Sequence, residues 1–172
     1  MKEYTISIFS ENEIGILSRV VTVFTRRHIN IESINASMSS IKGIYRYTIV
    51  VNVTEEMIKK LTAQLDKQVD ILKSFYNESS EIVYQEIALY KVPTDVFMNG
   101  DKVENLIRSH NARILSIEPK YIVLEKTGHQ SDTTAFFKAL ENFGVYEFVR
   151  SGRVAVSKPM EQLNAYLQSV ET

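Results

Sequence analysis

The period of the apolar residues changes along the first half of the chain in a fixed order, and this order restricts the possible folds. Alternation over residues 4–9 predicts a strand, and from Ile16 the apolar residues recur at helical spacing. The residues expected on the core face of that helix are Leu17, Val20, Val21 and Phe24. The remaining elements of this half are strands at 31–38, 44–53 and 69–76 and a helix capped by Thr54. The predicted order is strand, helix, strand, strand, helix, strand.

The same order returns after a short polar segment, Asn77–Glu81, which has no periodicity. Strands are predicted at 82–92, 113–118, 121–127 and 145–150. The two helices between them are expected to begin at the caps Asp101 and Ser131. We place a domain boundary in the polar segment and expect two domains, residues 1–78 and 79–172. The sequence therefore predicts an α+β fold of two tandem ferredoxin-like βαββαβ sandwiches, each with its helices on one face of an antiparallel sheet.

Two further patterns follow this repeat. Val154 and Val156 alternate with smaller or polar residues, which predicts an additional edge strand. Apolar residues at helical spacing over Met160–Val170 predict a terminal helix.

The composition excludes several kinds of site and partner. With 172 residues, 44% hydrophobic and 24% charged, the chain can form packed cores. It has no cysteine, which excludes disulfides, thiolate metal sites and cysteine nucleophiles. A formal charge of -1 gives no general attraction to phosphate backbones, and no apolar run is long enough to cross a membrane. Because Met1–Tyr4 runs directly into a strand pattern without a signal peptide, we expect a cytoplasmic protein that binds neither nucleic acid nor membrane.

No group of residues has the spacing of a catalytic or metal site. His28, His110 and His129 are far apart and lie on different predicted elements. The six glycines form neither of the phosphate-binding patterns, and the serines of the second strand have no neighbouring base. We therefore expect that the chain is not an enzyme and binds no metal.

The loop between the first strand and the first helix is the one segment whose chemistry suits a small ligand. Gly15 lets the backbone approach closely, and the N–H groups of Gly15, Ile16 and Leu17 are among the unpaired donors at a helix start. With the positive end of the helix dipole they suit a carboxylate, to which Asn12 can add its amide. The same residues also fit an ordinary strand–helix turn that contains a glycine.

Several blocks of the sequence resemble one family closely. Glu11–Val20, Phe24 and Arg26–Ile34 are similar to the start of acetolactate synthase small subunits, which begin with an ACT domain, a βαββαβ amino-acid sensor. Arg46–Ile49 resembles the third strand of that domain, and Val149–Val156 resembles an "R-[ST]-G" segment near the C-terminus. The resemblance covers nearly the whole chain in order and length, and it identifies residues 1–78 as the ACT domain.

The resemblance implies a ligand for the loop. In this family valine, and sometimes leucine or isoleucine, binds between two ACT domains and inhibits the holoenzyme. Carried onto this sequence, the residues that receive the carboxylate are Asn12, Gly15, Ile16 and Leu17. Asn30 of the partner subunit would accept from the ammonium group, although an asparagine before a strand is also common as a turn residue.

The resemblance also implies partners. It indicates a homodimer joined through the ACT domains, and a regulatory subunit that activates a separate large catalytic subunit. Thiamine diphosphate, Mg²⁺ and FAD are expected on the large subunit and no cofactor on this chain. Three features depart from the family pattern, one of which is Lys158–Pro159 in place of the usual Arg-Gly. His28 stands where glycine is usual, which implies a positive φ, and Asn35–Ser40 replaces a stretch that usually contains proline and acidic residues.

Three other functions are compatible with the predicted fold class. Another ACT-type sensor, such as a transcriptional regulator, would need a DNA-reading element, and no basic helix or helix-turn-helix is found. An RNA-binding domain would need an aromatic pattern that Gly43–Ile49 matches only in part. An acylphosphatase-like enzyme shares the fold class, but a fold alone specifies no function.

Overall fold

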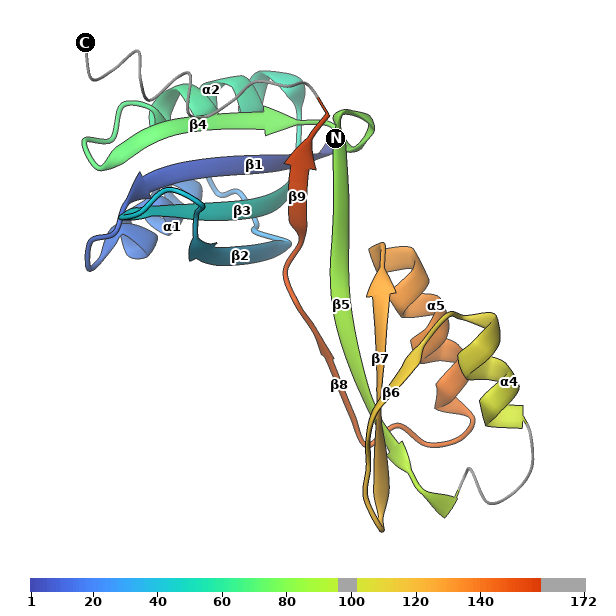
Figure 1. Cartoon of the computed structure of the whole chain (residues 1–172). Coiled ribbons are helices and arrows are strands. Elements are labelled where there is room, and N and C mark those ends of the chain that lie inside the picture. Colours follow the sequence, from blue (N-terminus) through green and yellow to red (C-terminus); the bar gives the residue numbers. More distant parts are fainter. Residues whose placement is uncertain (96–101, 159–172) are drawn as a thin grey trace. The chain divides into compact units, whose positions relative to one another are not determined.

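The computed structural model describes residues 1–95 and 102–158, and these form two compact units (Figure 1). The first unit contains Met1–Tyr84 and the segment that begins at Arg153, and the second contains Gln85–Gly152. Within the described ranges no helix has the length and apolar content needed to cross a membrane. The predicted division of the chain at residue 78 stays a prediction, to which the structure adds that the segment from Arg153 packs with the first unit.

The first unit is built in the predicted order. Its elements are β1 (Lys2–Glu11), α1 (Ile16–Arg26), β2 (Ser33–Met38), β3 (Ile44–Val53), α2 (Glu55–Leu65) and β4 (Ile71–Asn77). The antiparallel sheet has the strand order β2-β3-β1-β4. β1 is central and pairs with β3 over its whole length, from Lys2 opposite Val53 to Glu11 opposite Ile44.

The second unit repeats this topology. Its elements are β5 (Ile82–Pro93), α4 (Lys102–Ser109), β6 (Arg113–Ile117), β7 (Tyr121–Gly128), α5 (Gln130–Glu141) and β8 (Glu147–Arg150). The start of β5, up to Tyr84, belongs to the first unit. The strand order is β6-β7-β5-β8, and β9 (Val154–Ser157) pairs with β5 outside this path. The predicted fold of two ferredoxin-like βαββαβ units is therefore confirmed, as is the additional strand at Val154 and Val156.

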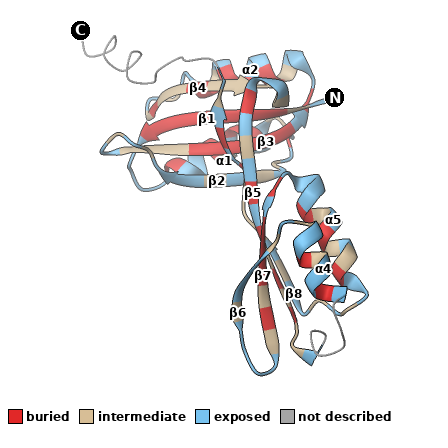
Figure 2. Cartoon of the chain, turned by 45° about the vertical axis from the view of Figure 1, so that its right-hand side comes forward, coloured by how far each residue is buried: buried red, intermediate tan, exposed pale blue. Residues whose placement is uncertain are grey.

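Each unit has its own hydrophobic core between the sheet and the two helices. The core of the first unit includes Tyr4, Ile6, Ile8, Val20, Phe24, Ile49, Val51, Ile58, Leu61 and Leu65. The core of the second includes Ala88, Tyr90, Val92, Ile107, Ile122, Leu124, Phe136 and Leu140. Figure 2 shows β1 and β3 mostly buried and the edge strand β2 mostly exposed. The alternation along β1 thus directs one set of side chains to the helices, as the sequence predicted.

The core face of α1 differs from the predicted one. Ile16, Val20, Val23 and Phe24 are buried. Leu17 is 43% exposed and Val21 is only half-buried, so the prediction that both face the core was wrong. Two overlapping sets of apolar residues satisfy the helical period in this segment, and the packing of Ile16 against the sheet selects the set at i, i+4, i+7 and i+8.

Several predicted boundaries also change. The helix expected to be capped by Ser131 begins two residues earlier, because His129 caps it and donates its N–H to Asp132 Oδ2 at 3.0 Å. The predicted strand at 69–76 begins at Ile71, with Val69 exposed in the preceding turn. Thr54 is confirmed as a cap, since its hydroxyl accepts from Met57 N. The predicted cap Asp101 and terminal helix Met160–Val170 lie outside the described residues.

Candidate functional site

The loop between β1 and α1 is held at both ends. Asn12 N donates to Gly43 O at 3.0 Å, which ties the loop to the β2–β3 turn. Gly15 caps α1 with φ at 90°, a left-handed conformation that glycine adopts without steric cost. A Cβ added at Gly15 would meet no atom within 4 Å, so the space next to this backbone is open.

The start of α1 has backbone donors that receive no side-chain cap within residues 1–95 and 102–158. The first helical bond runs from Arg19 N to Gly15 O at 3.1 Å, so the N–H groups of residues 16–18 precede the hydrogen-bond ladder. Gly15 provides no side-chain cap, and the first turn contains no acidic residue. By contrast, α2 begins with the Thr54 cap followed by Glu55 and Glu56. The first turn of α1 thus contributes no carboxylate to the positive end of the helix, which suits a bound carboxylate.

Apolar side chains are exposed beside these donors and on the adjacent edge of the sheet. Ile14 is fully exposed in the loop, and Leu17 projects from the first turn of α1. Ile34 and Met38 are exposed on the edge strand β2. Exposed aliphatic groups of this kind are a surface that an aliphatic ligand side chain or another apolar surface can cover.

Asn30 lies at the other end of α1. The segment that leads to it turns at His28, whose φ of 54° confirms the left-handed conformation expected where the family has glycine. Asn30 Nδ2 donates to Glu32 Oε1 at 3.0 Å, which leaves the side-chain oxygen to act as an acceptor. The 11 residues of α1 span about 16 Å, and Gly15 and Asn30 lie beyond its opposite ends. The four loop residues are therefore brought together within one chain, and Asn30 is not brought to them.

Arg19 contacts the loop, and the sequence analysis did not predict this role. Its guanidinium lies 2.9 Å from Asp70 Oδ2 and 4.0 Å from Glu13 Oε2. The side chain thus links the loop to the turn before β4. The only sequence signal was its position one helical turn after Gly15, because the partner Asp70 is remote in sequence.

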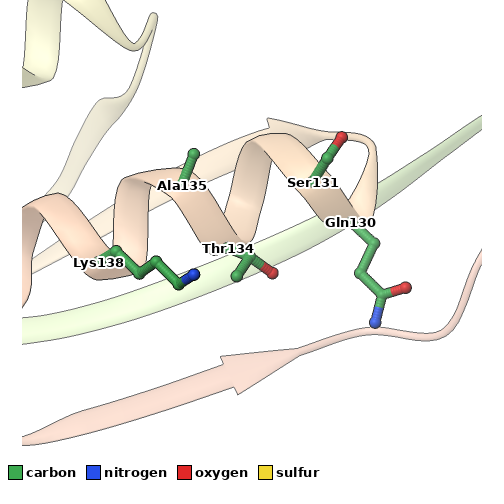
Figure 3. Close-up of a pocket in the computed structure, with 5 residues that line it drawn as sticks. All are labelled: Gln130, Ser131, Thr134, Ala135 and Lys138. Carbon is green, nitrogen blue, oxygen red and sulfur yellow. The ribbon is translucent and has the colours of Figure 1, made fainter.

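The other candidates for a site are the histidines and a pocket in the second unit. Among the described residues, no group of three or more histidines and carboxylates is placed to hold a metal ion. A hollow of about 450 Å³ runs along α5, and Figure 3 shows the side chains that line it. They are Gln130, Ser131, Thr134, Ala135 and Lys138. This lining offers hydroxyls, an amide and one ammonium group but no acid or imidazole to act as a base.

Two family models match the chain. The one described as an AHAS small subunit-like ACT domain matches residues 6–73. The one described as the small subunit of acetolactate synthase matches residues 85–159.

Whole proteins match over nearly the full length. The acetolactate synthase small subunit of Mycobacterium bovis is 33% identical over 159 residues, which are 91% of this chain and 93% of that protein. The Bacillus subtilis small subunit is 33% identical over 152 residues, 88% of each chain. The crystal structure of the Thermotoga maritima small subunit covers 92% of this chain and 99% of its own, with a TM-score of 0.84 and 27% identity. Both units and their order are thus shared with these proteins.

Proposed function

This chain belongs to the family of acetolactate synthase small subunits, and on that premise we propose that it is a regulatory subunit that senses a branched-chain amino acid. In this proposal the first unit binds the effector, valine in the first place, and a separate large catalytic subunit carries out the reaction. The small subunit raises the activity of its partner and transmits feedback inhibition to it.

The observation that supports the effector site best is the start of α1. The unpaired N–H groups after Gly15, together with the positive dipole end, suit the carboxylate of an amino acid. Asn12 lies in the same loop and can add its side-chain amide. The exposed Ile14 and Leu17 suit the aliphatic part of the ligand. Leucine and isoleucine carry the same charged groups and an aliphatic side chain, so a direct comparison of the three amino acids is needed to identify the effector.

In this proposal the ammonium group of the effector is bound by an acceptor from a second copy of the chain, as the resemblance to the family implies. Because Gly15 and Asn30 lie beyond opposite ends of α1, which is about 16 Å long, the proposal takes Asn30 from a second copy of the chain. A neutral amide accepts from the ammonium without the cost of burying a second charge. Of the two edge strands of the first sheet, β2 is the one proposed for such a dimer, because Ile34 and Met38 are exposed on it.

We assign no chemical step to this chain. The proposal places thiamine diphosphate, Mg²⁺ and FAD on the large subunit. The residues named in the candidate site bind and orient an effector through N–H groups, an amide oxygen and apolar contacts, and none of them is a base or nucleophile.

The test is a titration of the reconstituted holoenzyme with valine, leucine and isoleucine. Gly15→Asp places a carboxylate where the effector carboxylate should bind, and aspartate tolerates left-handed backbone better than most residues, so we expect strong resistance to the effector. Asn30→Ala should weaken binding about 5- to 150-fold, the equivalent of about 1 to 3 kcal/mol for a lost partner. Activation measured without effector shows that each variant is folded.

Two matched controls separate the site from general damage. Gly144 has a φ of 83° and similarly open surroundings, but lies in the second unit, so Gly144→Asp adds the same charge and backbone strain elsewhere. Asn142→Ala removes an exposed amide at the end of α5. Both controls should remain sensitive to the effector. Equal sensitivity of Gly15→Asp and Gly144→Asp would remove the loop from the site.

A further inference from the structure

The face of the first sheet that points away from the helices is buried on the central strands β1 and β3. We call it the outer face, and its residues on β1 and β3 are Thr5, Ser7, Phe9, Thr48 and Val50, each no more than 5% exposed. An antiparallel sheet with helices on one face commonly leaves its other face to water. In this unit the start of β5 and the strand β9 contact the outer face instead, through two arginines.

Arg153 joins β1 to the beginning of β5. It is 2% exposed, and its Nη1 lies 2.9 Å from Glu3 Oε1 and donates to Thr5 Oγ1 at 2.8 Å. The guanidinium carbon lies 3.9 Å from the centre of the Tyr84 ring. A planar guanidinium that is paired, hydrogen-bonded and stacked fixes the relative position of these strands more tightly than apolar contacts do.

Arg46 joins β3 to β9. Its Nη2 donates to Ala155 O at 2.6 Å and to Ser7 Oγ at 3.2 Å, and the guanidinium lies over the Phe9 ring. Burial lowers the pKa of Arg46. Because the bond to β9 is made to a backbone carbonyl, it holds the strand itself rather than one mobile side chain.

The two arginines hold both of the chain segments that lead to the second unit. That unit is inserted between Tyr84 and Arg153, so the chain enters it through β5 and returns from it immediately before β9. At the other end of the outer face, β1 continues from Phe9 to Glu11 and into the loop that carries Gly15. The clamp residues, Arg46 and Arg153, therefore lie between that loop and both connections.

We propose that the clamp residues transmit effector binding at the α1 loop to the second unit. This rests on the proposed effector role of the loop. A shift of β1 on binding would change the contacts of Thr5 and Ser7 with the two arginines. Buried, directional contacts have few alternative geometries, so such a shift moves both connections together rather than being absorbed locally.

The test separates effector binding from inhibition. Arg153→Met keeps an apolar stem of similar length but removes the charge, and the partly exposed Glu3 can then be hydrated. Thr5→Val is nearly isosteric and removes only one acceptor of Arg153. The control is Arg108→Met, which removes an exposed arginine from one helical ion pair in the second unit. Effector affinity is measured by calorimetry on the small subunit, and inhibition is measured on the holoenzyme.

We expect Arg153→Met to bind valine with unchanged affinity while its holoenzyme resists inhibition. The residual activity at saturating valine should rise about 2- to 30-fold, the range in which mutations along a coupling route act. Thr5→Val should change it less in the same direction, and Arg108→Met should match the wild type. If Arg153→Met fails to fold, as judged by its thermal midpoint, Thr5→Val decides the question.

Three results would contradict the proposed role of the clamp residues. Inhibition of Arg153→Met and Thr5→Val like that of the wild type would show that no signal passes through these contacts. If inhibition is lost only in proportion to a loss of effector affinity, Arg153 acts on the effector site itself and not on transmission. A wild type that binds none of the three amino acids would reject the proposed effector role, and the clamp with it.

Discussion

A buried carboxylate in the second unit depends on one exposed cation. Glu125 on β7 is 4% exposed, and it accepts from Arg113 Nε at 2.9 Å and from Thr127 Oγ1 at 2.8 Å. The hydrogen bond from Arg113 is the larger cause, and with the bond from Thr127 it holds the pKa of Glu125 below its usual value. The charged form is therefore the form that stabilises the folded unit.

Arg113→Met should destabilise the protein by about 1 to 3 kcal/mol near neutral pH, because the charged, buried carboxylate loses the two N–H donors of the guanidinium. The pKa of Glu125 is lower in the folded state, so the stabilisation is complete above the unfolded value of about 4.3 and is lost as pH falls through the folded value. Urea unfolding at pH 7 and at pH 3 measures both ends of this range. An effect of equal size at both pH values would contradict the role of the charge.

Single residues were predictable from the sequence where the backbone limits the choice of amino acid. Few residue types tolerate a positive φ, so His28 in a glycine position indicated a left-handed turn that the structure confirms. Arg153 was not recognised, because its partner Thr5 is 148 positions away and a local pattern contains no information about such a contact. In the sequence Arg153 reads only as part of the R-[ST]-G segment.

At the level of elements, the edge strand β2 is the surface expected to form the dimer. Ile34→Lys puts a charge on this edge, where it opposes pairing with a second strand, so the variant should dissociate at concentrations at which the wild type is a dimer. Ile117→Lys makes the same change on β6, an edge strand of the second unit, and should not alter the dimer. Light scattering at micromolar concentration measures both. A monomeric wild type would reject the proposed assembly.

The order of the elements was predicted correctly because each one changes the period of its apolar residues. The predictions that were wrong concern details that the period of the apolar residues does not determine. Along α1 the apolar residues allow two faces, and Leu17 lies on the exposed one. At α5 both His129 and Ser131 can begin a helix, and the reciprocal bond with Asp132 favours His129.

At the level of the whole molecule, the proposal predicts a division of labour. The isolated chain should convert no pyruvate, and addition of its cognate large subunit should give a holoenzyme with a higher turnover than the large subunit alone. Steady-state assays of the two subunits, separate and mixed, measure this. Pyruvate conversion by the pure chain, or an unchanged partner, would reject the regulatory role.

The insertion of the second unit into the first could not be predicted, because it depends on where β9 returns. The polar segment Asn77–Glu81 indicated a boundary by composition, and in the structure it contains a short 3-10 turn, Ser79–Glu81. Ser79 Oγ donates to Glu3 Oε1 at 3.1 Å, and Lys2 Nζ donates to Glu78 Oε1 at 3.2 Å. These contacts across the chain fasten the segment to β1, although nothing in its composition distinguishes it from a linker.

The return of β9 also sets an order for biosynthesis. The ribosome releases β1–β4 before the residues that cover their outer face, and Arg153 emerges only after the entire second unit. Thr5, Ser7 and Thr48 are polar, so most of the outer face of the newly made sheet can remain hydrated during this interval. Pairing of β5 with β8 in the newly made second unit brings the two ends of that unit close together. This lowers the entropic cost of placing β9 in the first unit. The first sheet to be translated is thus the last to be completed.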